Sequence, residues 1–104
     1  MITEEMLIKV INQVHEINKR SRRDQLVAIE RSCERIKTML ADEGIIVHDP
    51  IGEKYDSSRT DCEANIISND ILKGLTITDV IKPVIYSGKS GKREIVQRGL
   101  VIVE

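Results

Sequence analysis

The chain has no tryptophan, no phenylalanine and only two tyrosines among its 104 residues, so large aromatic rings cannot form its core. Isoleucine, valine, leucine and methionine have to fill the interior instead. A chain this short also buries a smaller share of its surface than a longer one does. We therefore expect one compact domain, or two subdomains that share a partner, and we expect the chain to self-associate.

The sequence also lacks an excess of charge of either sign. Sixteen Lys and Arg residues stand against seventeen Asp and Glu residues, which gives a formal net charge of -1. Such a balance creates no overall field to hold the protein on nucleic acid or on an anionic membrane. We therefore expect neither nucleic acid nor membrane as a partner.

Long apolar runs and a secretory signal are missing as well. No run approaches the roughly 20 apolar residues that a membrane-spanning helix needs, and no signal peptide precedes Cys33 or Cys62. The two cysteines could pair, but one lies in a helical pattern and the other in a strand-like one. We expect both to be reduced and the protein to be cytoplasmic.

Neither proline nor glycine occurs in the first 43 residues, which favours helix throughout this region. Thr3 can cap a first helix, and Glu4 and Glu5 are well placed at the positive end of its dipole. The apolar residues that follow recur at spacings of three and four and so share one face. They are Met6, Leu7, Val10, Ile11, Val14 and Ile17.

The charged stretch 19–24 interrupts this stripe, and Ser21 or Asp24 can cap a second helix. The apolar positions of that helix are spaced 3, 4, 3, 4, which is typical of helices that pack nearly parallel or antiparallel. They are Leu26, Ile29, Cys33, Ile36 and Leu40, and Gly44 ends the helix. A single unbroken helix with a charged belt is the alternative.

Two helices with roughly 40 residues in all bury too little apolar surface to be stable alone. Pairing with a second copy would give a four-helix bundle. Residues 1–43 are therefore predicted to be a helical dimerisation region. Its predicted interface residues are Met6, Val10, Val14, Ile17, Ile29, Cys33, Ile36 and Leu40.

After Gly44 the pattern becomes strand-like: β-branched residues start a strand at 45–47, and the segments 62–67, 75–85 and 95–103 suggest further strands. Between the last two segments the sequence SGKSGKRE is typical of a hairpin tip. Residues 44–104 are therefore predicted to form a small antiparallel β domain. The expected fold class is α+β.

Motifs that would indicate chemistry fail on inspection. The sequence GKS at 88–90 is no phosphate-binding loop, because Pro83 stands where a glycine is required and no helix pattern follows. His15 and His48 have no partner at metal spacing, so a satisfied or exposed histidine is favoured over a ligand. The acidic residues of 49–61 lack the spacing of a calcium loop. We therefore expect that the protein is not an enzyme and that it binds neither a metal ion nor a cofactor.

Three stretches together resemble the GrpE family, the nucleotide exchange factors of DnaK-type heat-shock chaperones. They are AIERSCERIKTMLADEGIIV, PIGEKYDSSRTDCEA and GLVIV. The second bundle helix of the family carries Gly-Ile-Glu and ends in a Gly-Val or Gly-Ile step into the first strand. Residues 28–30 and 44–45 hold those places here.

The loop of this family reads approximately Gly-x-x-Phe-Asp-Pro, and a His follows three residues later. Gly52, Tyr55 and Asp56 match this pattern, whereas Ser57 replaces the Pro and Thr60 the His. Further on, Cys62 replaces an Ala of the family. The stretch MLIKVINQVHEINKR is similar to the end of the first bundle helix of the family.

The last hairpin of the family has a Gly-Arg tip and ends in a Val-x-Val strand. Gly91, Lys92 and Arg93, with Val101 and Val103, are similar to these, in a hairpin that is longer by two or more residues. Family members also carry a long helical stalk before the bundle. The resemblance therefore predicts either a truncated sequence or a short, divergent relative.

The resemblance implies a protein that binds the ATPase domain of a DnaK-type chaperone and promotes ADP release. A protein that prefers the open, nucleotide-free form must weaken nucleotide binding by the same factor, since coupling is reciprocal. The alternative is a dimeric adaptor of the same architecture with a non-chaperone partner. The chaperone-binding residues that the resemblance implies are Tyr55, Ser57, Ser58, Lys92, Arg93 and Val103. For Tyr55 the competing interpretation is a ring that folds back onto the sheet.

Overall fold

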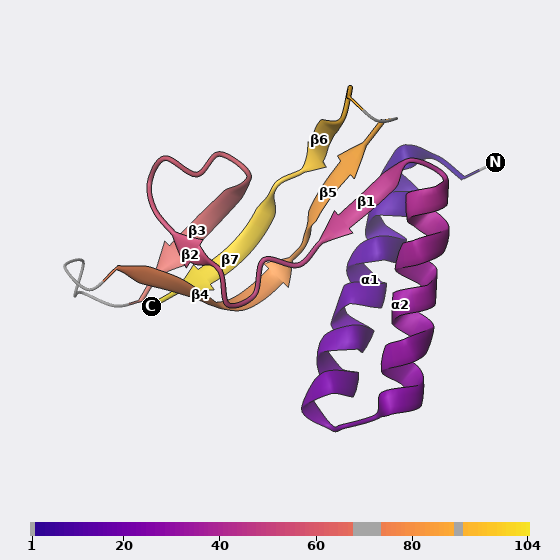
Figure 1. Cartoon of the computed structure of the whole chain (residues 1–104), viewed down its shortest axis with the longest axis horizontal. Helices are drawn as coiled ribbons and strands as arrows, with labels where there is room; N and C mark the ends of the chain where they lie inside the picture. The colour runs from indigo at the N-terminus through magenta and orange to yellow at the C-terminus, as the bar shows by residue number, and fades with distance from the viewer. Residues whose placement is uncertain (1, 68–73, 89–90) are drawn as a thin grey trace.

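The computed structural model describes residues 2–67, 74–88 and 91–104. The described residues form two helices followed by seven strands, which confirms the α+β class. The two helices lie side by side at one end of a molecule of 47 × 35 × 21 Å, and the strands extend away from them (Figure 1).

The first helix, α1, spans Glu4–Arg23 as the apolar spacing predicts. The Thr3 side chain accepts a hydrogen bond from the backbone N–H of Met6 at 3.1 Å, so the expected N-cap is confirmed. Acidic residues occupy its first turn and basic residues its last turn, which suits the helix dipole at both ends.

A tight turn separates α1 from α2, which spans Val27–Asp42, so the chain forms two helices and not one unbroken helix. Gln25 adopts a positive φ of 58° in this turn. The prediction that Ser21 or Asp24 caps the second helix is wrong. Asp24 is the C-cap of α1, and Leu26 occupies the N-cap of α2 without a side-chain hydrogen bond.

The strands form two sheets. The three-stranded sheet has the order β1-β5-β6, and the four-stranded sheet has the order β2-β4-β7-β3. Their bounds are β1 Ile45–His48, β2 Lys54–Tyr55, β3 Cys62–Ile66, β4 Leu75–Lys82, β5 Val84–Ser87, β6 Glu94–Gln97 and β7 Gly99–Val103.

The two sheets are successive halves of one long, bent hairpin (Figure 1). Only Pro83 separates β4 from β5, and only Arg98 separates β6 from β7. A proline has no N–H to donate to a strand partner, so the ladder breaks where the hairpin bends. The hairpin predicted around SGKSGKRE is present, although residues 89–90 of its tip lie outside the described residues.

The expectation of a purely antiparallel β domain is wrong in one pair. β3 runs parallel to β7, with Cys62 opposite Gly99 and Ile66 opposite Val103. The strand β2 was not predicted, because it is two residues long and lies in a polar stretch. It pairs with the start of β4, with Tyr55 opposite Leu75.

The core of the β domain contains small and medium apolar side chains, as the lack of tryptophan and phenylalanine requires. Six residues at 1% exposure or less form it: Cys62, Ile77, Val80, Val84, Val101 and Val103. Tyr55, Ala64, Leu75 and Tyr86 pack against this cluster and are partly exposed.

The helix α1 meets the β domain through polar side chains as well as apolar ones. Asn12 and Gln97 of β6 exchange two amide hydrogen bonds of 2.9 and 2.8 Å. Lys19 lies 2.9 Å from the carboxylate of Asp79 in β4. The charged stretch that interrupts the apolar stripe is therefore partly used for contact with the sheet.

Two further contacts complete this interface. His15 Nε2 lies 2.8 Å from the carbonyl oxygen of Val80, and Arg22 donates to Asp49 Oδ2 at 2.8 Å. The α1 contact residues, Asn12, His15, Lys19 and Arg22, are spaced 3, 4, 3 and so share one face of the helix. We call this set of contacts the polar seam.

Candidate protein-binding surfaces

The loop between β2 and β3 is held in shape by Arg59. Its guanidinium donates to Asp61 at 2.7 Å, to Glu53 at 2.6 Å and to the Lys54 carbonyl at 2.9 Å. The bond to Asp61, and after it the bond to Glu53, raise the pKa of Arg59. The same Arg59–Asp61 bond is the main cause that lowers the pKa of the Asp61 carboxyl. Arg59 is therefore engaged within the chain and is no free anchor for a partner.

The other carboxylate oxygen of Glu53 ties this loop to strand β1. Glu53 Oε2 lies 2.7 Å from His48 Nε2. His48 is thus paired with a carboxylate and half-exposed, in keeping with the expectation of a satisfied histidine.

Tyr55 folds back onto the sheet and also keeps an accessible side. Its ring packs against the β core beside Leu75, as a ring that folds back onto the sheet does. It also lines a surface depression of about 260 Å³ with Lys54, Asp56 and Thr76 among its neighbours. A partner can therefore reach one side of the ring.

The two predicted serines lie on the exposed tip of the same loop. Asp56 accepts hydrogen bonds from both the backbone N–H and the hydroxyl of Ser58. These bonds lower the pKa of the Asp56 carboxyl. Ser57 is exposed and precedes this turn. The loop therefore presents its tip in a fixed shape.

Arg93 immediately precedes β6, beside exposed Lys92, and lines a second depression. This depression measures about 400 Å³, and Ile46, His48 and Tyr86 form the rest of its wall. We call it the β-sheet groove. No ion pair among the described residues uses Arg93, so its guanidinium is available to a carboxylate outside the chain.

Sequence reasoning missed Tyr86 as a surface residue. Its position in β5 places it opposite Ile46 of β1 and Ile95 of β6, at the middle of the three-stranded sheet. Burial against the core raises the pKa of its hydroxyl. The available signal was composition, since one of only two tyrosines falls in a strand where its ring has a solvent-facing side.

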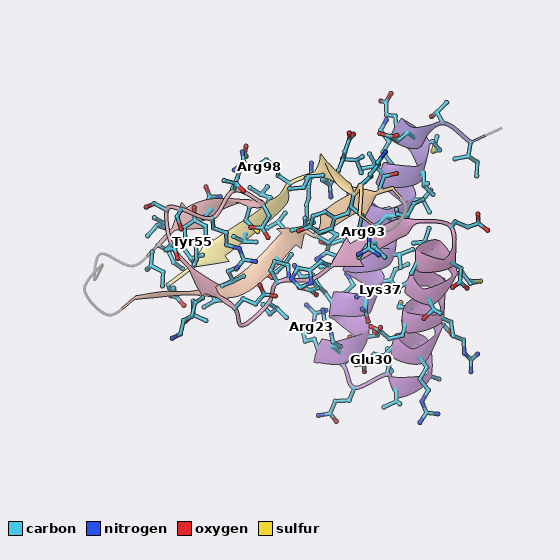
Figure 2. The ribbon with its side chains drawn as sticks, turned by 45° about the horizontal axis from the view of Figure 1, so that its top comes forward. Arg23, Glu30, Lys37, Tyr55, Arg93 and Arg98 are labelled. Atoms are coloured by element: carbon cyan, nitrogen blue, oxygen red, sulfur yellow. The ribbon has the colours of Figure 1, made fainter. Side chains whose placement is uncertain are left out.

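The predicted chaperone-binding residues do not form one patch. Tyr55 lies toward the end of the β domain that is remote from the helices, whereas Arg93 lies near the helical end (Figure 2). Val103 is fully buried in the core, so its side chain is not on the surface. The loop tip and the β-sheet groove are therefore two separate surfaces.

An uncovered apolar stripe runs along the helical hairpin. Four of the eight predicted interface residues are about half exposed: Met6 at 52%, Val10 at 48%, Ile17 at 50% and Ile29 at 43%. Val14, Ile36 and Leu40 are partly buried, and Cys33 is buried. Cys33 and Cys62 are free, and burial raises the pKa of both thiols.

Known proteins offer no further guide, because no family model, curated protein or solved structure matches this chain. Within residues 2–67, 74–88 and 91–104, no cluster of three or more His, Cys, Asp or Glu side chains could hold a metal ion. None of the described helices combines the length and apolar character needed to cross a bilayer.

Proposed function

We propose that the chain is a GrpE-like nucleotide exchange factor, which binds the ATPase domain of a DnaK-type chaperone and promotes ADP release. The observation that carries this proposal is the arrangement of a helical hairpin with an uncovered apolar stripe before a small β domain with exposed loops. The sequence matches to the family occur in the same order along the chain.

The helical hairpin would dimerise through its apolar stripe. In the single chain Met6, Val10, Ile17 and Ile29 leave apolar surface in water. A second copy would bury this surface in a four-helix bundle, with a gain of roughly 25 cal/mol for each Å² that is removed from water. The bundle would then fix the positions of two β domains.

Ile29→Asp tests the dimer, because it would place an unpaired charge in the bundle interface. Thr38→Asp is the matched control, since Thr38 is exposed and nine residues along α2, which places it on the opposite face of the helix. In sedimentation the parent and Thr38→Asp should be dimers and Ile29→Asp a monomer. A dimer of unchanged affinity in Ile29→Asp would disprove this interface.

The β-sheet groove is the better candidate for the main contact with the chaperone. It combines a planar guanidinium that can bind a carboxylate in a bidentate way with an aromatic ring beside it. Arg and Tyr are enriched among the residues that dominate binding energy. Tyr55 and the loop tip would form a secondary contact, separate from the first.

Release of a fluorescent nucleotide from a DnaK-type chaperone of the same genome, followed by stopped flow, tests the function directly. Saturating protein should accelerate release, and Arg93→Ala should weaken binding by about 1–3 kcal/mol. Arg20→Ala, an exposed arginine on α1, is the control and should behave like the parent. No acceleration by the folded, dimeric parent would reject exchange.

The adaptor with a non-chaperone partner is the second candidate. Three positions of the loop pattern are replaced, by Ser57, Thr60 and Cys62, and in the structure the Cys62 side chain is buried in the core. A dimer that binds no DnaK-type chaperone but loses another partner on Arg93→Ala would establish the adaptor instead.

A further inference from the structure

His15 is a titratable side chain buried inside the polar seam, between α1 and the β domain. The residue is 3% exposed. Its Nε2 lies 2.8 Å from the carbonyl oxygen of Val80 in β4. Because a carbonyl oxygen only accepts hydrogen bonds, this nitrogen must carry a proton and donate it.

The other ring nitrogen has no hydrogen-bond partner. His15 Nδ1 is one of two buried side-chain atoms without one among the described residues. In the neutral ring it carries a lone pair, and the carboxylate oxygen Asp49 Oδ2 lies 4.0 Å away. An acceptor thus faces a negatively charged oxygen, so neither gains a hydrogen bond from the other.

Asp49 is held in place as a carboxylate. Its Oδ1 accepts the backbone N–H of Ile51 at 3.1 Å, and its Oδ2 accepts from Arg22 at 2.8 Å. Burial raises the pKa of this carboxyl, but the bonds from Arg22 and Ile51 more than offset that effect and leave it below its ordinary value. Asp49 is therefore ionised throughout the neutral range.

Protonation of Nδ1 would convert this unfavourable arrangement into an ion pair. The imidazolium would donate from both nitrogens, to Val80 in β4 and to the carboxylate that follows β1. Imidazole is the side chain that ordinarily gains a proton between pH 8 and pH 5. We propose that His15 is a proton-operated latch, which holds α1 to β4 alone when neutral and to both β4 and Asp49 when protonated.

The other charged groups of the seam already have partners of opposite charge. Arg22 already occupies Asp49 Oδ2 and would share it with His15. On β4, Asp79 is neutralised by Lys19 at 2.9 Å. These charged groups are thus paired with one another, whereas His15 has a buried ring nitrogen without a hydrogen-bond partner.

The latch also affects the proposed binding surface, because Asp49 is the next residue in the chain after His48, which lines the β-sheet groove. A stronger hold on Asp49 would fix the end of β1 that forms one wall of the groove. This consequence rests on the proposed function, whereas the latch concerns the chain alone and is testable without any partner.

The direct test follows both histidine rings by long-range ¹H–¹⁵N NMR between pH 8 and pH 5.5. For His15 we expect the Nε2–H form at pH 8 and, at pH 5.5, two ring N–H groups with a slowly exchanging Nδ1 proton. A His15 ring with its proton on Nδ1 at pH 8, or one that stays neutral in the folded protein at pH 5.5, would overturn the proposal.

Urea unfolding at the same two pH values supplies a second measurement. The parent's ratio of folded to unfolded chains should rise several-fold from pH 8 to pH 5.5. The variant His15→Gln keeps a donor toward Val80 but does not titrate, and it should lose this rise, whereas His48→Gln, the matched control, should keep it. If His15→Gln does not fold, Asp49→Asn replaces it and should shift His15 protonation to lower pH. A rise that persists in His15→Gln, or unchanged His15 protonation in Asp49→Asn, would refute the latch.

Discussion

The interior of the β domain and the polar seam both hold buried side chains, but they use opposite chemistry. The β core consists of four valines, one isoleucine and one cysteine, each at most 1% exposed. The seam joins α1 to the strands through an amide pair, two ion pairs and one histidine contact. Apolar burial varies little with pH or salt, whereas charged contacts depend on both.

This difference indicates which part of the molecule can respond to its surroundings. The β core has no titratable group apart from the Cys62 thiol, and burial keeps that thiol protonated. The seam contains His15, Asp49, Arg22, Lys19 and Asp79 within one interface. We infer that a change of pH or salt weakens or strengthens the contacts between α1 and the β domain before it affects the β core.

The largest loss of stability should come from a substitution that leaves a cavity in the β core. Ile77→Ala removes a side chain that is 1% exposed in β4 and should lower the free energy of unfolding by about 2–5 kcal/mol. Ile66→Ala is the control, because Ile66 is 52% exposed on β3 and should cost less than about 1 kcal/mol. Urea unfolding measures both. Equal losses would mean that the core is not where the structure places it.

The β core is also the part that the sequence predicts best. The β-branched segments after Gly44 indicate its strands, because apolar β-branched residues favour a buried sheet wherever they occur. The strand β2 and the parallel pairing of β3 with β7 escaped prediction. Pairing partners are decided by contacts between distant segments, which local patterns do not contain.

The seam was predicted worst. Residues 19–24 look like a solvated charged stretch, and His15 looks like an isolated histidine, because their partners lie 27 to 65 residues away in the sequence. The spacing of Asn12, His15, Lys19 and Arg22 was a usable signal, since polar residues on one helix face can line an interface. Arg93 was predicted from the sequence as a candidate binding residue, whereas Tyr86, which lines the β-sheet groove with it, was not.

A medium effect, with a definite pH dependence, should follow from Asp49→Ala in the seam. The change removes the acceptor of Arg22 and of the Ile51 N–H, and should cost about 1–2 kcal/mol at pH 7. The folded-state pKa of Asp49 is lowered, so its contribution is complete above the ordinary pKa of about 4 and is lost as pH falls below that value.

Urea unfolding of the parent and Asp49→Ala across pH 3–8 checks this prediction. The difference between them should be present at pH 5 and above, and it should shrink below about pH 4. Asp42→Ala, an exposed carboxylate at the end of α2, is the control and should change stability by less than about 0.5 kcal/mol. A difference that grows below pH 4 would contradict the assignment of Asp49 as a bonded carboxylate.

The smallest effect should come from the partly exposed ion pair of Lys19 and Asp79 in the seam. Its contribution should depend on salt, whereas that of the uncharged amide pair should not. The side chains of Lys19 and Asp79 are 27% and 44% exposed, so Lys19→Ala should cost less than about 1 kcal/mol at low salt. At about 1 M salt the screening length falls to roughly 3 Å, and the cost should nearly vanish.

Asn12→Ala provides the comparison, because its amide pair with Gln97 carries no net charge. It should cost about 1 kcal/mol at both salt concentrations. Lys9→Ala is the matched control for lysine loss, since among the described residues exposed Lys9 pairs with Glu5 of its own helix and no other, and its loss should change little under either condition. If Lys19→Ala costs as much at high salt as at low salt, packing of the lysine stem and not its charge holds that end of α1 to the sheet.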